Sequence, residues 1–405
     1  MHKFRHTCRL CSSANLEQVL RLAPTALCDA YLQEPRHQNV YPLNLCLCID
    51  CGFAQIDCVI DPEEIYRDYL FVTTSSSPLR KHFRSYVDDA LNRAEKPNEA
   101  TVVDIGSNDG TLLNEFQIKG CRVLGIEPAR EIARTANQMG IRTIPEFFGS
   151  EIIPEILSQT GPADIVTVNN LFANVDNLEE FVTNIKKILK TAGLLVIESS
   201  YLKDMLDNLV FDFIYHEHLS YFSFTPLYLF FKKFEMNLFD ARPVPTKGGS
   251  LRYFISNSQH PSEIPTTASD WLKRERDGRL TEADTYKQFN DRIGKSRSDL
   301  IDVLQQYDKS QVVGYGASAT STTLIASFGL DRYLGFLVDD FKAKQDTFSP
   351  GVHLRVSDPK EIYTDAVEVV VILAWRYADE IIRRHDNFRG VFVIPLPTLR
   401  VVAQG

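Results

Sequence analysis

Short apolar runs alternate with stretches of helical periodicity along most of this chain. From about Lys81 the runs read TVVDIG, VLGIEP, DIVTVNN and GLLVIESS, and after residue 310 they read QVVGYGA, YLGFLVDD, VEVVVILAW and VFVIPLP. Strands this apolar are typical of parallel sheets that helices cover on both faces. Because 405 residues exceed the size at which one hydrophobic core usually stops growing, we predict two separate α/β sheets of the doubly wound, Rossmann-like kind.

Composition and spacing divide the chain into three predicted domains. Residues 1–72 hold most of the cysteines and little helical periodicity, which is typical of a small domain that a metal stabilises. Residues 73–260 hold the first α/β series, which LFDARPVPTKGGSLRYFIS closes as a predicted antiparallel hairpin. Residues 261–405 begin with a charged segment that we expect to form helices bridging the domains, and the second sheet follows. The expected buried positions of the bridging segment are Leu272, Leu280, Phe289 and Leu300.

The charge and the start of the chain exclude several classes of partner. Lys and Arg total 44 against 53 Asp and Glu, a net charge of −9, which disfavours binding to nucleic-acid phosphates. No segment approaches the roughly 20 apolar residues of a membrane span, and MHKFRHTCRLC lacks the apolar run of a secretory signal. We therefore expect a cytoplasmic protein, a monomer or small homo-oligomer, whose cysteines are metal ligands rather than disulfides.

Two C-x-x-C pairs stand in the first predicted domain. Cys8 with Cys11, and Cys48 with Cys51, supply the four thiolates that a tetrahedral structural zinc site requires. The alternatives are a set in which Cys46 competes as a ligand, and four buried free cysteines. A catalytic zinc is disfavoured because four protein thiolates leave no position open for water or substrate.

An acidic, glycine-rich turn follows the first strand of the central series. A tight turn at this place lets the backbone approach a ligand at the next helix's N-terminus, and its carboxylates suit a cationic ligand better than a pyrophosphate. Glu127 ends the following strand, where an acid hydrogen-bonds ribose hydroxyls in doubly wound nucleotide-binding folds. Turn and acid together fit S-adenosylmethionine, and the alternative is a turn that merely connects strand and helix. The candidate residues of the turn are Asp104, Gly106, Asn108, Asp109 and Gly110.

A second glycine turn opens the third predicted domain. Gly314 and Gly316 belong to a G-x-G-x-x-A pattern, and Asp339 follows at the end of the next strand. Such a turn holds a diphosphate against a helix N-terminus. Three interpretations stay open here: a nucleotide-sugar diphosphate, NAD, or a plain connecting turn.

Histidines, a carboxylate and phenols gather after the strand GLLVIESS, on the side where open α/β sheets bind ligands. The segment YHEHLSY contains Tyr215, His216, Glu217, His218 and Tyr221. A histidine here can serve as a general base, because its unperturbed pKa lies nearest to working pH. A metal-binding histidine pair and a histidine that only packs are the alternatives.

Together these motifs resemble the sugar C-methyltransferases of deoxysugar biosynthesis, which methylate a nucleotide-linked 4-keto-6-deoxyhexose, usually at C3. The resemblance covers nearly the whole chain. It rests on the C-x-x-C pairs, VVDIGSNDGTLL with GIEP, YHEHLSYFS, GGSLRYF, GYGAS, VDDFKAKQDTFSPGVHL and VVVILAWRYADEI. It implies a zinc-binding domain, a class I S-adenosylmethionine methyltransferase domain and a third, Rossmann-like domain that closes over a nucleotide-sugar.

The resemblance also implies roles for particular residues. The family's active-site group of tyrosine, glutamate and histidine falls on Tyr215, Glu217 and His218. Cofactor contacts are expected to extend to Pro128, Asn169 and Asn170. Acceptor contacts are expected from Lys247, Ser250, Arg252, Gly314, Gly316, Ser318, Asp339 and Lys344.

The implied reaction needs a base, because carbon becomes a nucleophile only as an enolate. We expect His218 to remove the proton next to the ketone, Tyr215 or Tyr221 to donate to the enolate oxygen, and a segment with Tyr66, Tyr69 and residues 73–77 to close over the site.

Departures from the family pattern leave the acceptor open. Asn174 and Lys247 stand where relatives usually have histidine, and Thr320 and Ser321 stand where relatives usually have lysine and glycine. A different nucleotide-linked acceptor, an NAD-dependent sugar oxidoreductase and a non-enzymatic zinc-bearing module are the alternatives.

Overall fold

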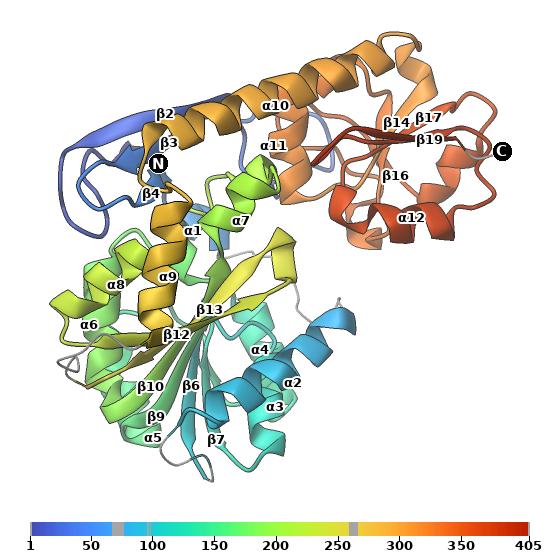
Figure 1. Ribbon diagram of the computed structural model, residues 1–405. Helices are drawn as coiled ribbons and strands as arrows, with labels where there is room; N and C mark the ends of the chain where they lie inside the picture. Colours follow the sequence, from blue (N-terminus) through green and yellow to red (C-terminus); the bar gives the residue numbers. More distant parts are fainter. Residues whose placement is uncertain (1, 67–76, 95–96, 98, 259–265, 404–405) are drawn as a thin grey trace.

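The computed structural model describes residues 2–66, 77–94, 97, 99–258 and 266–403. A small sheet at the amino terminus and a larger α/β body lie next to each other, and a second α/β body follows at the carboxyl end (Figure 1). Both α/β bodies contain a mostly parallel sheet, so the predicted fold class is confirmed.

The amino-terminal sheet is built mainly from one long antiparallel hairpin. Its order is β11-β4-β3-β2, and a separate pair joins β1 to β5. The strands are β1 (His2–Phe4), β2 (Leu16–Thr25), β3 (Tyr41–Cys48), β4 (Ala54–Ile56), β5 (Cys58–Ile60) and β11 (Ser220–Tyr221). The edge strand β11 comes from far along the chain, directly after the predicted catalytic histidine. Helix α1 (Pro62–Tyr66) follows the sheet.

The central sheet has seven strands in the order β12-β13-β10-β9-β6-β7-β8. Five of them are parallel: β6 (Thr101–Ile105), β7 (Arg122–Ile126), β8 (Thr143–Ile144), β9 (Ala163–Asn169) and β10 (Leu189–Ser200). The predicted hairpin is present as β12 (Asn237–Val244) and β13 (Ser250–Ser256), and β13 pairs antiparallel with β10. The carboxyl ends of the parallel strands therefore meet at one edge, where ligands bind in such sheets.

Helices cover both faces of this sheet (Figure 1). They are α2 (Ser77–Leu91), α3 (Thr111–Ile118), α4 (Arg130–Gln138), α5 (Ile153–Thr160), α6 (Leu178–Ile188), α8 (Phe224–Lys233) and α9 (Thr266–Asp277). Helix α7 (Leu202–Asp207) lies apart from them, and its buried residues belong to the core that includes the third domain. The central parallel strands β6 and β9 are almost entirely buried, which explains their largely apolar sequence.

The charged bridging segment is helical, as its spacing predicts. Helix α10 (Ala283–Leu304) runs from the small amino-terminal sheet to the third domain (Figure 1). Of the expected buried positions, Leu280, Phe289 and Leu300 are buried, and Leu272 is half-buried.

The third domain holds a six-stranded sheet in the order β16-β15-β14-β17-β18-β19. Only the edge strand β19 is antiparallel to its neighbour. The elements are β14 (Val312–Tyr315), α11 (Ala319–Phe328), β15 (Phe336–Val338), β16 (Val356–Ser357), β17 (Val369–Ile372), α12 (Ala378–Arg384), β18 (Val391–Ile394) and β19 (Arg400–Ala403).

The three domains share elements across the limits predicted at residues 72/73 and 260/261, and those limits stay a prediction. Strand β11 belongs to the central segment by sequence but pairs with β4 of the amino-terminal sheet. Among the described residues, no helix is both long and apolar enough to cross a bilayer.

Candidate functional site

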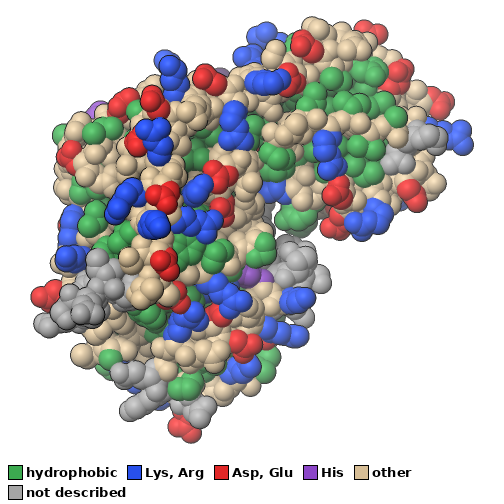
Figure 2. All heavy atoms as spheres, in the orientation of Figure 1, with side chains coloured by type: hydrophobic (Ala, Val, Ile, Leu, Met, Phe, Trp, Pro, Cys, Tyr) green, Lys and Arg blue, Asp and Glu red, His purple; other side chains and the backbone are tan. Residues whose placement is uncertain are grey.

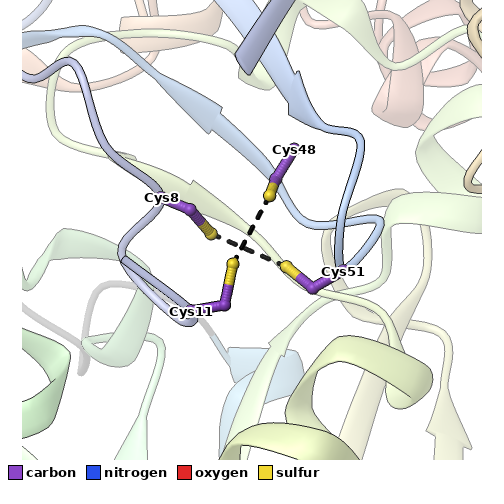
Figure 3. Close-up of side chains that lie close together, drawn as sticks. All are labelled: Cys8, Cys11, Cys48 and Cys51. Carbon is purple, nitrogen blue, oxygen red and sulfur yellow. Dashed lines mark hydrogen bonds between the residues drawn. The ribbon is translucent and has the colours of Figure 1, made fainter. Parts of the chain in front are cut away.

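The four predicted metal ligands converge in the amino-terminal domain (Figure 3). The sulfur atoms of Cys8 and Cys51 lie 3.6 Å apart, and those of Cys11 and Cys48 lie 3.5 Å apart. All four Sγ atoms lie within 4.8 Å of one another. Zn–S bonds of about 2.3 Å in a tetrahedron place sulfurs about 3.8 Å apart, so the donor set fits a structural zinc.

This cluster ties the amino-terminal loop to the turn between β3 and β4. Backbone hydrogen bonds from Ser12 N to Cys8 O and from Gly52 N to Cys48 O form the two tight turns that direct the thiols inward. Cys46, the competing candidate, is buried within β3 and does not belong to the group. The metal site therefore holds the strand β4, on which β11 pairs.

A cavity of about 440 Å³ lies at the carboxyl edge of the central sheet. Seven of the nine predicted cofactor residues line it, and they come from the ends of β6, β7 and β9: Asp104, Gly106, Asn108, Glu127, Pro128, Asn169 and Asn170. Gly106 has φ +74°, and a Cβ atom there would lie 3.0 Å from Leu171. This close approach requires glycine at the turn.

Glu127 is held with its carboxylate toward the turn. Its two oxygens accept hydrogen bonds from the backbone N–H groups of Asn108 and Ala129, at 3.0 and 2.9 Å. Burial raises the pKa of Glu127, and these two bonds oppose the rise. The remaining lone pairs of the carboxylate can accept from a pair of vicinal hydroxyls, as a ribose offers.

Asp104 lies deeper, at the end of β6. Its Oδ1 accepts a hydrogen bond of 2.6 Å from the Thr167 hydroxyl, and only 2% of the residue is exposed. Burial raises the pKa of Asp104 to about 7. A bound cation would reverse much of that shift, because an opposite charge favours the ionised carboxylate.

The other two predicted cofactor residues do not line the cavity. Asp109 Oδ1 accepts from both the backbone N–H and the hydroxyl of Thr111, so its carboxylate caps the start of α3. Gly110 adopts φ +77° where a Cβ atom would lie 2.8 Å from Ile141. Both residues shape the turn from outside the cavity.

The cavity also has an apolar wall that the sequence motifs did not reveal. Its aromatic members are Phe83, Phe147, Phe148 and Phe181. Phe147 and Phe148 follow β8, and the rule that ligands bind at strand ends was the one signal that could have indicated them. Phe83 and Phe181 lie on helices and carry no such signal.

The predicted catalytic histidine is fixed at both ring nitrogens. His218 Nδ1 lies 3.1 Å from the Phe213 carbonyl oxygen, to which it donates, and Nε2 lies 3.3 Å from the Tyr215 hydroxyl. Because a carbonyl only accepts, neutral His218 carries its proton on Nδ1 and a lone pair on Nε2. The ring also stacks on Phe213, with centroids 6.0 Å apart.

The surroundings keep His218 neutral. Burial, followed by the charge of Lys247, lowers the pKa of His218 to about 3. The ring borders a small cavity of about 10 Å³, and Asn170 lines both this cavity and the larger one. Asn170 therefore separates His218 from the predicted cofactor side.

Two side chains connect the large cavity with the histidine segment. The Tyr66 hydroxyl, on α1, donates to the backbone oxygen of buried Glu217 at 3.3 Å. Lys247 lines the large cavity with an exposed side chain, and desolvation by the surrounding protein lowers the pKa of its ammonium. The carboxylates of Glu198 and Glu217 oppose this effect.

Two predicted acceptor residues near Lys247 are turned away from the cavity. Ser250 is fully buried and donates to Thr246 O at 3.0 Å. The guanidinium of fully buried Arg252 pairs with Glu198, at 2.8 Å, and with Asp89. This placement favours a structural role for both residues.

The glycine turn of the third domain uses its backbone donors internally. Asp339 accepts from Ala317 N at 2.6 Å and from Phe341 N at 2.8 Å, and the Ser318 hydroxyl caps α11. Gly316 has φ +112° and packs against Ala374, whereas Gly314 is buried within β14. Lys344 donates to Asp29 of the amino-terminal domain at 2.8 Å and to Ala317 O at 2.9 Å.

The surface is hollowed between the central and third domains, with acidic and basic side chains interspersed around it (Figure 2). Of the segment expected to close over the site, Tyr66 lines the large cavity and contacts Glu217. Tyr69 and residues 73–76 lie outside the described residues, as does the side chain of Ser77.

Three protein-family models match consecutive parts of the chain. A zinc binding domain matches residues 8–66, a methyltransferase domain matches residues 79–239, and a C-methyltransferase C-terminal domain matches residues 245–397. Together with the cavity and the cysteine cluster, these matches define the class: the chain is an S-adenosylmethionine-dependent methyltransferase with a zinc-binding domain.

A curated relative narrows the class. The chain is 30% identical over 405 residues to C-methyltransferase NovU of Streptomyces niveus, an alignment that covers 98% of this chain and 96% of that protein. This chain therefore belongs to the C-methyltransferase family, and the resemblance to sugar C-methyltransferases drawn from its motifs is confirmed.

Solved structures match at lower similarity. The plantazolicin methyltransferase BpumL with a bound substrate analogue and S-adenosylhomocysteine is 14% identical, with a TM-score of 0.37, over 46% of this chain and 88% of that one. The magnesium protoporphyrin IX methyltransferase of Synechocystis PCC 6803 is 10% identical, with a TM-score of 0.34, over 44% and 80%.

Proposed function

We propose that this C-methyltransferase acts on a nucleotide-linked 4-keto-6-deoxysugar and transfers the methyl group to C3. The observation that carries the proposal is the geometry of His218: a neutral ring with its lone pair on Nε2, beside a phenol and next to the cofactor side of the central sheet. A C–H bond next to a ketone is acidic enough for such a base, and the resulting enolate carbon is the nucleophile.

The negative charge that develops on the sugar during proton transfer makes His218 a stronger base. In the free protein His218 has a pKa of about 3 and is a weak base. An enolate forming beside the ring adds a negative charge, which raises the pKa of His218 during the transfer. A positioned base of this kind contributes roughly 10²–10⁴-fold to the rate.

Lys247 supplies positive potential for the enolate oxygen. The Tyr215 hydroxyl, which donates to His218 Nε2 in the free protein, becomes available as a donor to the enolate oxygen once Nε2 takes the proton from the acceptor. Lys247 lines the cavity, at a position where the family resemblance leads us to expect histidine. A cation that meets developing negative charge in a site with little water stabilises the transition state more than it would in bulk water. S-adenosylmethionine supplies the electrophilic methyl group.

The NAD-dependent alternative gains no support from the third domain. Asp339 already accepts one hydrogen bond from the backbone N–H of Ala317 in the glycine turn and one from the backbone N–H of Phe341 in its own loop. A dinucleotide pyrophosphate would have to compete with that carboxylate for Ala317 N.

The test is a mass-spectrometric screen with S-adenosylmethionine that carries a trideuterated methyl group. Acceptors are nucleotide-linked 4-keto-6-deoxyhexoses with different bases, and each is paired with its 4-hydroxy counterpart as a control. We expect one trideuteromethyl group on carbon in a keto sugar and none in any 4-hydroxy control. Methylation of a 4-hydroxy sugar, methylation on oxygen, or no product from any keto sugar would contradict the proposal.

A further inference from the structure

The segment that precedes the predicted catalytic residues is bound to the third domain at every position. The Phe211 ring stacks on Phe328 of α11, with centroids 5.2 Å apart. The carbonyl oxygen of Ile214 accepts a hydrogen bond of 3.1 Å from the Thr323 hydroxyl of the same helix. Asp212 and Phe213 contact the loop that follows β17.

Asp212 makes the strongest of these contacts. Its carboxylate is fully buried, and Arg376 donates to it through both terminal nitrogens at 3.1 Å. The indole N–H of Trp375 donates to the same carboxylate at 2.9 Å. A bidentate pair of this kind is stronger than a single hydrogen bond, and it also fixes the orientation of the carboxylate and the guanidinium.

From there a short path leads to the histidine. The guanidinium of Arg376 also lies 4.4 Å from the centroid of the Phe213 ring. Phe213 stacks on His218, and its carbonyl oxygen accepts the Nδ1 proton of the same ring. The residue that sets the tautomer of His218 is therefore held between Asp212 and the third domain.

The other side of the segment is held by the amino-terminal domain. Ile56 N on β4 donates to Leu219 O at 3.0 Å, and Arg9 donates to the same oxygen at 3.2 Å. Residues 215–218 thus lie between two anchored stretches that belong to different domains.

We propose that Trp375 and Arg376 are positioning residues of the methyl-transfer site, which hold Asp212 and Phe213 so that His218 presents Nε2 to the acceptor. The third domain then takes part in catalysis because it orients His218. This role does not depend on which acceptor the enzyme binds. This inference rests on the proposed role of His218 as the base.

A structural ion pair between domains is the competing explanation, and it predicts a different result. Removal of one partner from a buried pair leaves the other charge unpaired, so some loss of stability follows in either case. Only the positioning role predicts a change at the His218 ring while the protein stays folded and binds cofactor.

The experiment uses the full chain labelled with ¹⁵N-histidine, and the signals of His218 are assigned by their loss in His218→Gln. The variants are Arg376→Met, which removes the guanidinium group, and Trp375→Phe, which keeps an aromatic ring and removes the indole N–H donor. Arg400→Met is the matched control, because it breaks an exposed pair with Asp379 of 2.8 Å in the same domain. S-adenosylhomocysteine binding is measured for every variant.

We expect the wild type and Arg400→Met to show one neutral tautomer of His218, with the proton on Nδ1. Arg376→Met should show a mixture of tautomers, and Trp375→Phe a smaller change in the same direction. With a methylated acceptor in hand, kcat of Arg376→Met should fall by roughly 10², as a misplaced catalytic group does, while the dissociation constant for S-adenosylhomocysteine stays within about threefold.

Wild-type tautomer signals in a folded Arg376→Met variant would overturn the inference. If that variant does not fold, unchanged His218 signals in Trp375→Phe would do so. Because the nuclear magnetic resonance measurement needs no acceptor, failure to methylate any keto sugar would count against the proposed function and leave the tautomer result to decide the positioning role.

Discussion

At the scale of single residues, the cofactor cavity places two buried carboxylates in different surroundings. Glu127 is braced by two backbone N–H groups, whereas Asp104 has one hydroxyl partner and a pKa raised to about 7 by burial. The first arrangement suits a fixed acceptor for hydroxyl groups. The second suits a group that ionises when a cation arrives.

Cofactor binding should release a proton from Asp104. Between about pH 5 and 7 the free protein holds this carboxyl protonated, and the positive charge of S-adenosylmethionine lowers its pKa. Affinity should therefore weaken as pH falls below about 7, by at most tenfold per pH unit. Calorimetry at pH 6.5 in buffers of different ionisation enthalpy measures the release, which should disappear in Asp104→Asn. Equal proton release by wild type and Asp104→Asn would show that another group is responsible.

Replacing Glu127 by Gln should weaken cofactor binding. Gln keeps the size of the side chain, but its single oxygen can accept from only one of the backbone N–H groups of Asn108 and Ala129, and the charge behind the hydrogen bonds to ribose is lost. Charged hydrogen bonds of this kind contribute roughly 1.5–3 kcal/mol, so the dissociation constant should rise about 10- to 100-fold. Glu131→Gln is the control, because that exposed side chain of α4 pairs with Arg134 on the surface. Unchanged binding by Glu127→Gln would mean that the ribose lies elsewhere.

At the scale of elements, strand pairing links the zinc cluster to the predicted catalytic segment. The metal braces the turn between β3 and β4, and β4 carries β11, which begins two residues after His218. Loss of the metal should therefore loosen the histidine segment as well as the small domain.

Wild-type protein should contain one zinc per chain, and Cys8→Ser combined with Cys48→Ser should contain none. The double variant should unfold at a lower temperature and lose methyl transfer, because the brace of β4 is gone. Cys46→Ser is the matched control, since this buried cysteine of β3 lies outside the cluster. Metal analysis decides the matter: zinc retained by the double variant, or well below one per chain in wild type, contradicts the assignment.

The strand pattern of the sequence predicts some positions of the candidate site, but it does not predict contacts between distant segments. The ends of parallel strands meet at one edge, so the positions of Asp104, Glu127 and Asn169 followed from the strand pattern alone. Arg252 looked equally available for substrate, but its partner Asp89 is 163 residues away, and no local pattern indicates that pair. Pairing of β11 with the amino-terminal sheet, and the contact of Arg376 with Asp212, likewise depend on how domains pack.

At the scale of the whole molecule, three domains meet at residues 211–221. The central sheet carries the cofactor cavity, the amino-terminal domain holds the segment from β4, and the third domain holds it from α11 and the loop after β17. Each domain alone lacks part of the proposed site, and the family similarity spans nearly the entire chain. We propose that this shared segment presents His218 as the base.

The most direct test of that claim compares His218→Ala with wild type on the keto sugar found by the acceptor screen. Binding of S-adenosylhomocysteine is the control for folding, and deuterium uptake at the acceptor carbon in heavy water reports proton removal without methyl transfer. We predict that the variant binds S-adenosylhomocysteine normally, loses deuterium uptake and loses at least about 10² of kcat, the smallest usual effect of removing a general base. A variant that methylates within about tenfold of wild type would contradict the account.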